Sequence, residues 1–312
     1  MELSLLLAEK ILSMALMGVV GYAIVRIGLF QAEDSGMLSK LIVYVISPCV
    51  IVNAFQIDYS ASKVRGLLLA ILAAVIIHVV LIGATSLLSR PLHFNNIEQA
   101  SLIYSNCGNL IIPLVQGVLG AEWVFYTCGY SIVQTIMIWT HGTSVICKGE
   151  KSGLKKILLN PNVIATVVGL VMFFGKLHFP SVISDCMTGF GSMIGPGSMV
   201  VIGMLMGKVD LKWLFGQKRP YLICFLRLVF LPAVAAVIFR FSGMLKLHEQ
   251  AETILLISLL AGMAPVAAMV TQIAQVYHQD AVYASAINVM TIIFCIVTMP
   301  LMVLFYQWLL LL

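Results

Sequence analysis

The sequence contains few charged residues. Only 10% of its 312 residues are Asp, Glu, Lys or Arg, whereas 61% are hydrophobic. Soluble globular domains carry about 25% charged residues, so this chain has too few to cover the surface of a water-soluble globule of its length. The shortage excludes a cytosolic enzyme, a nucleic-acid binder and a disordered chain. It leaves a polytopic all-α protein embedded in a lipid bilayer.

The sequence also lacks motifs for metal binding, disulfides and hydrolytic catalysis. Its seven cysteines include no C-x-x-C pair, and neither H-E-x-x-H nor G-x-S-x-G occurs. His78 and His141 lie in apolar runs without a carboxylate or a second histidine at ligand spacing. We therefore expect no metal, no cofactor and no disulfide framework. A membrane-embedded enzyme would need such groups at membrane depth, so we expect no enzyme.

Acidic residues are missing from the middle of the apolar runs. All 13 lie at run ends or in loops, and Glu122 and Asp280 intrude furthest. Proton-coupled carriers usually hold an ionisable relay deep in the membrane. Uniport therefore fits better than a carboxylate shuttle, as does coupling through a histidine, the substrate's own proton or backbone-bound sodium.

Apolar runs long enough to cross a bilayer dominate what is present. A hydrocarbon core of about 30 Å takes about 20 helical residues, and strand-like alternation is absent. The runs predict ten transmembrane helices, at residues 5–30, 38–57, 64–88, 100–119, 124–147, 161–177, 188–206, 220–239, 253–276 and 282–304.

Lys and Arg in the short connections predict the orientation of these helices. One alternating set of connections holds eleven of them, and the set that includes the N-terminus holds six. We expect the first set in the cytoplasm, with both termini outside the plasma or inner membrane. The chain starts with an acid where a signal peptide has its basic region, so the first run is expected to remain as a span.

A polar stretch at residues 148–160 is expected to be a cytoplasmic linker between two five-helix halves, residues 1–147 and 161–312. Five spans are an odd number, so the second half must enter the membrane inverted. Inverted repeats of this kind build many secondary transporters.

Matching prolines support the repeat. Pro48 and Pro196 interrupt the second and seventh spans, and Pro113 and Pro265 lie 15 and 16 residues after matching Glu-Gln-Ala sequences. Breaks in the fourth and ninth spans would bring helix N-termini and free carbonyls together near mid-membrane, which predicts a site made of backbone. Two kinked packing helices remain the alternative.

Polar side chains near these breaks are candidate substrate ligands. Asn106 and Asn109 share a helical face and could bind a carboxylate, or could satisfy the carbonyls that Pro113 frees. Gln134 and Asn288, in the fifth and tenth spans, could line the site or bond across helices. Asn53, near the end of the second span, could contact substrate from the other side or mark an interface.

Arg227 is the one basic residue well inside a run. It could attract an anionic substrate, or reach the cytoplasmic surface and a lipid phosphate. Two small-residue patterns, Gly191-xxx-Gly195 and Gly203-xxx-Gly207, are typical of close helix packing, within one domain or at a dimer seam.

The order and spacing of several short motifs resemble the auxin efflux carrier family, in its compact prokaryotic branch. Residues 21–30, 38–44 and Pro48 resemble its opening. Asn106, Pro113 and residues 114–120 are similar to its fourth-helix crossover. Gly262, Pro265 and residues 284–301 resemble its ninth-helix crossover and last span. Many prokaryotic members carry Asn or Thr soon after the second proline, whereas here Thr271 and Gln272 arrive later.

The resemblance implies a bile-acid-symporter-like or sodium/proton-antiporter-like fold. A dimerising scaffold would contain spans 1, 2, 6 and 7, and a moving transport domain spans 3–5 and 8–10. We therefore predict a homodimeric secondary transporter of small organic anions, carboxylates or auxin-like acids, with an elevator mechanism. The candidate substrate-binding residues are Asn106, Asn109, Pro113, Pro265, Gln134, Asn288, Arg227 and Asn53. A channel or a ligand sensor on the same fold is the alternative, and no nucleic acid is expected as a partner.

Overall fold

The computed structural model describes residues 2–147, 158–207, 209 and 211–312. Most of the predicted linker, residues 148–157, lies outside the described residues. The described chain is helical, apart from one isolated β-bridge between Ser105 and Val266.

The first half contains the following helices, where η marks a 3₁₀ or π turn: α1 Glu2–Arg26, η1 Ala32–Asp34, α2 Ser35–Leu41, η2 Ile42–Ile46, α3 Ser47–Ala54, α4 Ala61–Leu92, α5 Asn96–Ile103, η3 Cys107–Ile111, α6 Ile112–Val118, η4 Ala121–Trp123, α7 Val124–Met137, η5 Ile138–Gly142 and α8 Thr143–Ile146. The second half contains α10 Pro161–Gly175, α11 Ser181–Ser192, α12 Ile194–Gly207, α13 Leu211–Gly216, α14 Arg219–Phe225, η6 Leu226–Phe230, α15 Leu231–Phe241, η7 Met244–Lys246, α16 Ala251–Gly262, α17 Ala268–Val276 and α18 Ala281–Leu311.

Local sequence signals explain where several helices begin. The side chain of Ser60 accepts a hydrogen bond from the Lys63 N–H at the start of α4. Asn95 and Glu98 form a reciprocal capping box on α5, and the Asn160 side chain caps α10. These side chains satisfy N–H groups that the first helical turn leaves without intrahelical partners.

The length and hydropathy of the helices define a multi-pass membrane protein. Among the described residues, six helical stretches are long and apolar enough to cross a membrane, and shorter apolar helices include Cys107–Val118, Pro161–Gly175 and Ala251–Gly262. Each predicted apolar run coincides with helices of the structure. Large apolar side chains such as Leu12, Leu16 and Val19 on α1 are exposed, as expected for a surface that faces lipid.

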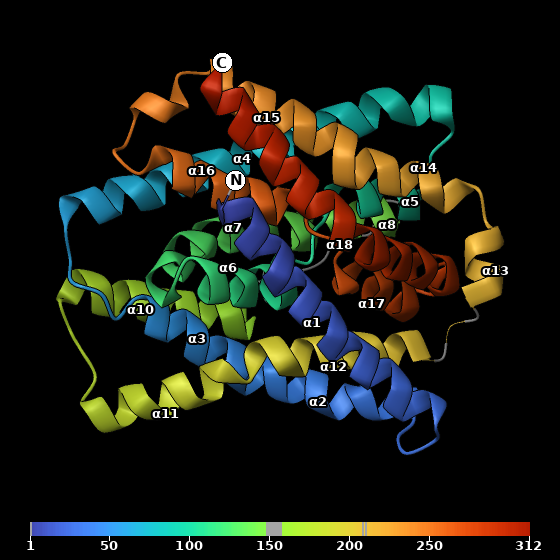
Figure 1. The fold of residues 1–312 in the computed structure, drawn as a ribbon, viewed down its shortest axis with the longest axis horizontal. Coiled ribbons are helices and arrows are strands. Elements are labelled where there is room, and N and C mark those ends of the chain that lie inside the picture. Colours follow the sequence, from blue (N-terminus) through green and yellow to red (C-terminus); the bar gives the residue numbers. More distant parts are fainter. Residues whose placement is uncertain (1, 148–157, 208, 210) are drawn as a thin grey trace.

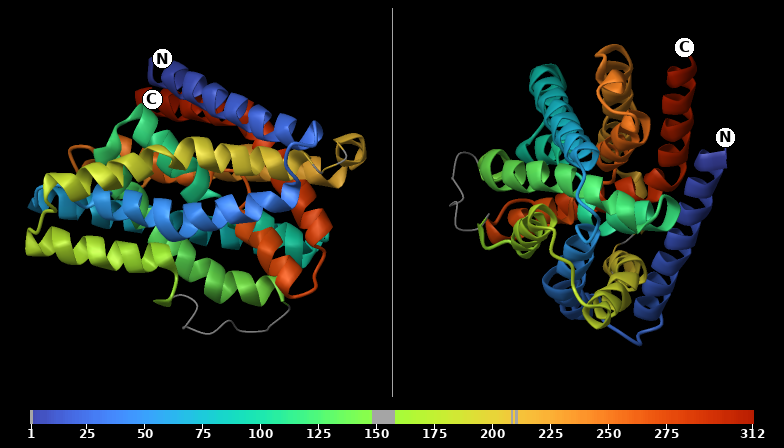
Figure 2. Two further views of the ribbon diagram at one scale, coloured as in Figure 1. Left: turned by 90° about the horizontal axis from the view of Figure 1, so that it is seen from below. Right: turned by 90° about the vertical axis from the view of Figure 1, so that its left-hand side faces the viewer.

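Two sets of helices are named here by their place in Figure 1, and they pack against each other through α1 and α18 and through α1 and α6. The α1 group contains α1 to α3 and α10 to α12, and it occupies the lower part of Figure 1. The α4 group contains α4 to α8 and α14 to α18, and it occupies the upper part, with α6 reaching toward the centre. The two ends of the chain lie on the same side of the molecule in both views of Figure 2, and α1 packs against α18.

Glycines allow the closest approach within the α1 group. A Cβ added at Gly203 on α12 would collide with the Gly18 carbonyl oxygen of α1, and one at Gly207 would lie 2.7 Å from the Val25 side chain. The predicted Gly203-xxx-Gly207 pattern is therefore a packing seam between these two helices. Close packing at such small-residue seams is a main source of helix association in membranes, because the hydrophobic effect does not drive helices together in lipid.

We expect Gly203→Ala to destabilise the protein by about 1–3 kcal/mol or more, because the added methyl group has no space without a backbone shift. The measurement is thermal unfolding of the purified protein in detergent. Gly83→Ala on α4 is the matched control, since a Cβ there meets nothing within 4 Å. Equal melting temperatures for the two variants would contradict the seam.

Candidate functional site

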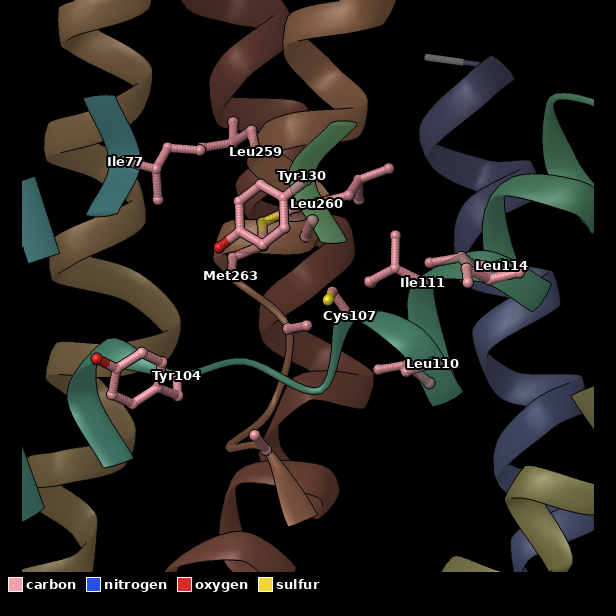
Figure 3. Packing of buried hydrophobic residues seen from close by; sticks show 14 of the residues in the cluster. Ile77, Tyr104, Cys107, Leu110, Ile111, Leu114, Tyr130, Leu259, Leu260 and Met263 are labelled. Atoms are coloured by element: carbon pink, nitrogen blue, oxygen red, sulfur yellow. The ribbon is translucent and has the colours of Figure 1, made fainter. Parts of the chain in front are cut away.

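Two helix breaks cross each other at the centre of the structure. The first lies at residues 104–106, between α5 and η3, and the second at residues 263–267, between α16 and α17. The Asn106 N–H donates to the Pro265 carbonyl at 2.8 Å, and the Ala267 N–H donates to the Tyr104 carbonyl at 3.0 Å. Figure 3 shows the extended chain between Tyr104 and Cys107 beside the segment that follows Met263. The two broken spans thus meet through one antiparallel β-bridge, between Ser105 and Val266, and the extended segments around these two residues are called the first and the second strand below.

The first break lies earlier than the proline that suggested it. Pro113 is buried near the start of α6 and does not interrupt the helix. The π turn η3, where the Ile112 N–H bonds to the Cys107 carbonyl, precedes it directly. A π turn alters the carbonyl pairing before a proline, which itself lacks an N–H. The expected interruption near residue 113 is therefore corrected to residues 104–106.

Gln134 on α7 satisfies the outer edge of the first strand. Its side-chain oxygen accepts from the Ser105 N–H at 3.2 Å and from the Ser105 hydroxyl, and its amide nitrogen donates to the Ser105 carbonyl at 2.6 Å. Because Gln134 is buried, no solvent competes for these bonds. Its amide group thus takes the place of a neighbouring peptide.

Two α18 side chains satisfy the outer edge of the second strand. The Val266 N–H donates to the Thr291 hydroxyl at 3.1 Å, and the Asn288 amide donates to the Val266 carbonyl at 2.8 Å. Thus α7 in the first half and α18 in the second half support equivalent strands in the same manner. Gln134 and Asn288 were predicted either to line the site or to bond across helices. Both side chains form the bond across helices.

Arg227 lies behind the crossover in η6. It is fully buried, and its guanidinium donates to backbone carbonyls of both interrupted spans: Leu102, Ile103 and Ala264. It is not among the residues that line the large cleft. The side chain points into the protein rather than to the lipid surface.

A cleft of about 1650 Å³ reaches the crossover from one end of the molecule. Asn106 and Asn109 line it from the first broken span, and Ala268 and Met269 at the N-terminus of α17 line it from the second. Asn288 lines it from α18, so this residue both holds a strand and faces the cleft. The half-helices that follow the two breaks begin at η3 and at α17, and their N-termini carry partial positive charge. Both N-termini therefore border one cleft.

Several polar groups along the cleft have unused hydrogen-bonding capacity. In the described part of the chain, the side-chain amides of Asn106 and Asn109 make no hydrogen bond, although Asn106 is 6% exposed. The hydroxyl oxygens of Thr271 and Ser198 are buried without a partner. Buried polar groups normally have partners, so these groups are available for a ligand.

The remaining walls of the cleft are largely apolar, with Trp139, Val289 and Ile292 on one side and Val201 and Ile202 on the other. Lys40 is exposed and stands among the lining residues. The cleft combines convergent polar groups with apolar walls, as small-molecule sites generally do.

Asn53 lies away from this cleft. Its amide donates to the Thr188 hydroxyl at 3.4 Å, and both residues line a separate pocket of about 20 Å³ with Gln116. That volume has room for about one water molecule. The structure therefore does not bring Asn53 together with Asn106 and Asn109.

Sequence reasoning missed an ion pair in the first turn of α5. Glu98 is 2% exposed, bonds to Arg219 at 2.7 Å and accepts from the Tyr283 hydroxyl at 2.7 Å. It is more deeply buried than either Glu122 or Asp280, the acids expected to intrude furthest. The only local signal was the Asn-x-x-Glu capping pattern. The ion pair joins α5, α14 and α18 within the α4 group.

The fold is that of a multi-pass membrane protein with a cleft, and comparison with known families gives its class. The model of the family described as "Membrane transport protein" matches residues 6–156 and 145–303. The chain belongs to this family, that of the auxin efflux carriers, and is a transporter rather than an enzyme. A search of curated proteins finds no match. Within the described residues, no three His, Cys, Asp or Glu side chains are grouped to hold a metal ion.

We expect Gln134→Leu to destabilise the protein by about 2 kcal/mol or more. It removes the partners of two buried backbone groups, and each unsatisfied group costs about 1–3 kcal/mol. The measurement is thermal unfolding in detergent. Thr135→Val is the matched control, because the Thr135 hydroxyl bonds only to the Ser131 carbonyl of its own helix. A control that is as destabilised as Gln134→Leu would contradict the bridging role.

Proposed function

We propose that the protein is a secondary transporter of small organic anions, carboxylates or auxin-like acids, that binds its substrate at the crossover. The observation that carries the proposal is the cleft that ends on two half-helix N-termini and on the unpartnered amides of Asn106 and Asn109. Amide donors and helix N-termini both favour an anion. The apolar walls suit the organic part of the molecule.

The two groups of helices suit an elevator mechanism. The α1 group corresponds to the scaffold that the family resemblance implies, and the α4 group to the transport domain. The strand pair, Gln134, Asn288 and Arg227 all belong to the α4 group, so the site is able to move as a unit. The scaffold contributes Ser198 and the apolar wall of α12 to the cleft.

Ten spans in two inverted halves explain how the crossover arises. α1 to α8 form one half and α10 to α18 the other, with η3/α6 and α17 as the outer parts of the interrupted spans. The cleft opens toward the end that holds Lys40, Asn160 and Gln275. This end is the cytoplasmic one if the distribution of Lys and Arg sets the orientation, which leaves both termini outside the cell membrane. A homodimer through the α1 group follows from the family resemblance alone.

The opposite end favours a carrier over a channel. There α3 of the α1 group packs against α7 of the α4 group, and the pocket between Asn53, Gln116 and Thr188 measures about 20 Å³. Alternating access requires one closed end of this kind. A ligand sensor would bind without flux, which reconstituted transport distinguishes.

We expect Asn106→Ala to fold but to bind carboxylates at least about tenfold more weakly, since a hydrogen bond to a charged group contributes about 1.5–3 kcal/mol. The measurement is thermal stabilisation of the purified protein by malonate, isovalerate and indole-3-acetate, because a ligand stabilises the state that it binds. Asn53→Ala is expected to bind as the wild type does. Undiminished stabilisation of Asn106→Ala would contradict the crossover site.

A disulfide between the two groups should stop transport and preserve binding. A Cβ at Gly195 on α12 would lie 3.4 Å from the Pro113 Cβ on α6, close to the separation of about 3.8 Å in disulfides. We expect the double variant Pro113→Cys/Gly195→Cys to lose uptake of a stabilising carboxylate into proteoliposomes on oxidation and to regain this uptake on reduction. Each single variant, oxidised in parallel, is the control. Full transport by the cross-linked protein would exclude movement at this interface.

A further inference from the structure

The contacts of Arg227 bear on whether the proposed anion transport is coupled to a cation. Its Nη1 donates to the carbonyls of Leu102 at 2.9 Å and Ile103 at 3.4 Å, and its Nη2 donates to that of Ala264 at 3.1 Å. The residue is 0% exposed. One guanidinium therefore bonds to both interrupted spans at once.

These carbonyls share a chemical character. Leu102 and Ile103 form the last turn of α5, and Ala264 follows the end of α16. The last carbonyls of a helix lack intrahelical partners and carry the negative end of the helix dipole. The end of α5 and the segment that directly follows α16 meet here. In transporters with interrupted helices, clusters of this kind coordinate a cation such as Na⁺.

No acid neutralises Arg227 in the described part of the chain. The ion pairs found there join Glu98 to Arg219 and Asp58 to His178. The guanidinium Nε is buried without a hydrogen-bond partner. The carbonyls are thus the partners of this charge, and a buried charge is tolerated only when it is bonded in this way.

We propose that Arg227 takes the place of a coupling cation at the crossover, so that anions bind without sodium. The guanidinium compensates the negative C-termini of α5 and α16 from behind, and the positive N-termini of η3 and α17 remain uncompensated on the cleft side. The crossover then carries a permanent positive potential. Arg227 is a positioning residue, because it acts through the backbone and not by contact with substrate. The role in anion binding rests on the proposed function, whereas the replacement of a cation does not.

The first test needs no substrate. Thermal unfolding of purified wild type and Arg227→Ala is measured in NaCl and in choline chloride at equal ionic strength, and again with added methylguanidinium chloride. We expect the melting temperature of the wild type to be the same in both salts. That of Arg227→Ala should be lower in choline, and should rise saturably with Na⁺ or methylguanidinium, which enter the vacated carbonyl cluster.

Arg240→Gln is the matched control, because the Arg240 Nε also donates to a helix carbonyl, that of Leu309, at 3.0 Å. It should show no specific response to either cation. The proposal is overturned if sodium stabilises the wild type as much as Arg227→Ala, or if neither cation rescues Arg227→Ala beyond the control. If Arg227→Ala does not fold, Arg227→Lys is measured instead. This variant keeps the charge, so it should fold and its melting temperature should not depend on sodium. A sodium-dependent Arg227→Lys would overturn the proposal.

The second test measures the effect on anions. Malonate, isovalerate or indole-3-acetate, whichever stabilises the wild type most, is compared with its amide. Arg227→Ala in choline should bind the carboxylate roughly tenfold or more weakly, with little change for the amide and with recovery in sodium. A purely structural role would weaken both ligands equally, and that result would refute the electrostatic role. If no carboxylate binds the wild type, the proposed function fails, while the salt dependence still decides the role of Arg227.

Discussion

Backbone polar groups have no solvent partner in the interior of a bilayer, and each unpaired N–H or carbonyl there costs several kcal/mol. Breaking a transmembrane helix exposes such groups. This chain breaks two helices and pairs the exposed segments with each other, through Asn106 with Pro265 and Ala267 with Tyr104. Gln134, Asn288 and Thr291 then bond to the outer edges of the pair. The extended segments are held from both sides within one group of helices.

This arrangement separates the charges of the four half-helices. Arg227 bonds to the Leu102 carbonyl at the end of α5 and to the Ala264 carbonyl just past the end of α16, and the N-termini of η3 and α17 border the cleft. Partial positive charge is thereby presented in a cleft with largely apolar walls, where its effect on an anion is less screened than in water. The supporting side chains belong to the α4 group, whereas the α1 group contributes mainly a wall. The side chains that hold the crossover thus lie within one group, as the elevator movement proposed above requires.

Much of the architecture was predictable because hydropathy and helix-breaking residues are local signals. The ten apolar runs coincide with helices, the second break contains Pro265, and Asn106 lies at the first break and lines the cleft. Pro113 gave the wrong position for the first break, because a π turn accommodates it within a continuing helix. The geometry that decides the roles of Gln134 and Arg227 was not predictable. A polar residue within a span has the same sequence signal whether it faces a ligand or a neighbouring backbone.

Glu98 illustrates the same limit for charges. It lies near a run end, and Arg219 and Tyr283, from distant segments of the sequence, bond to it and allow it to be buried. The substrate-binding roles of the site residues stay predictions.

Amide hydrogen exchange at the crossover, measured with and without a stabilising carboxylate, tests the account most directly. In the free protein, the amides of Ser105 and Val266 should exchange slowly, because side chains of α7 and α18 hold them. Asn109, Ala268 and Met269 line the cleft, and their amides should exchange faster. The carboxylate should slow exchange in these two segments together. Protection that appears elsewhere, or in only one segment, would contradict a shared anion site at the crossed helix breaks.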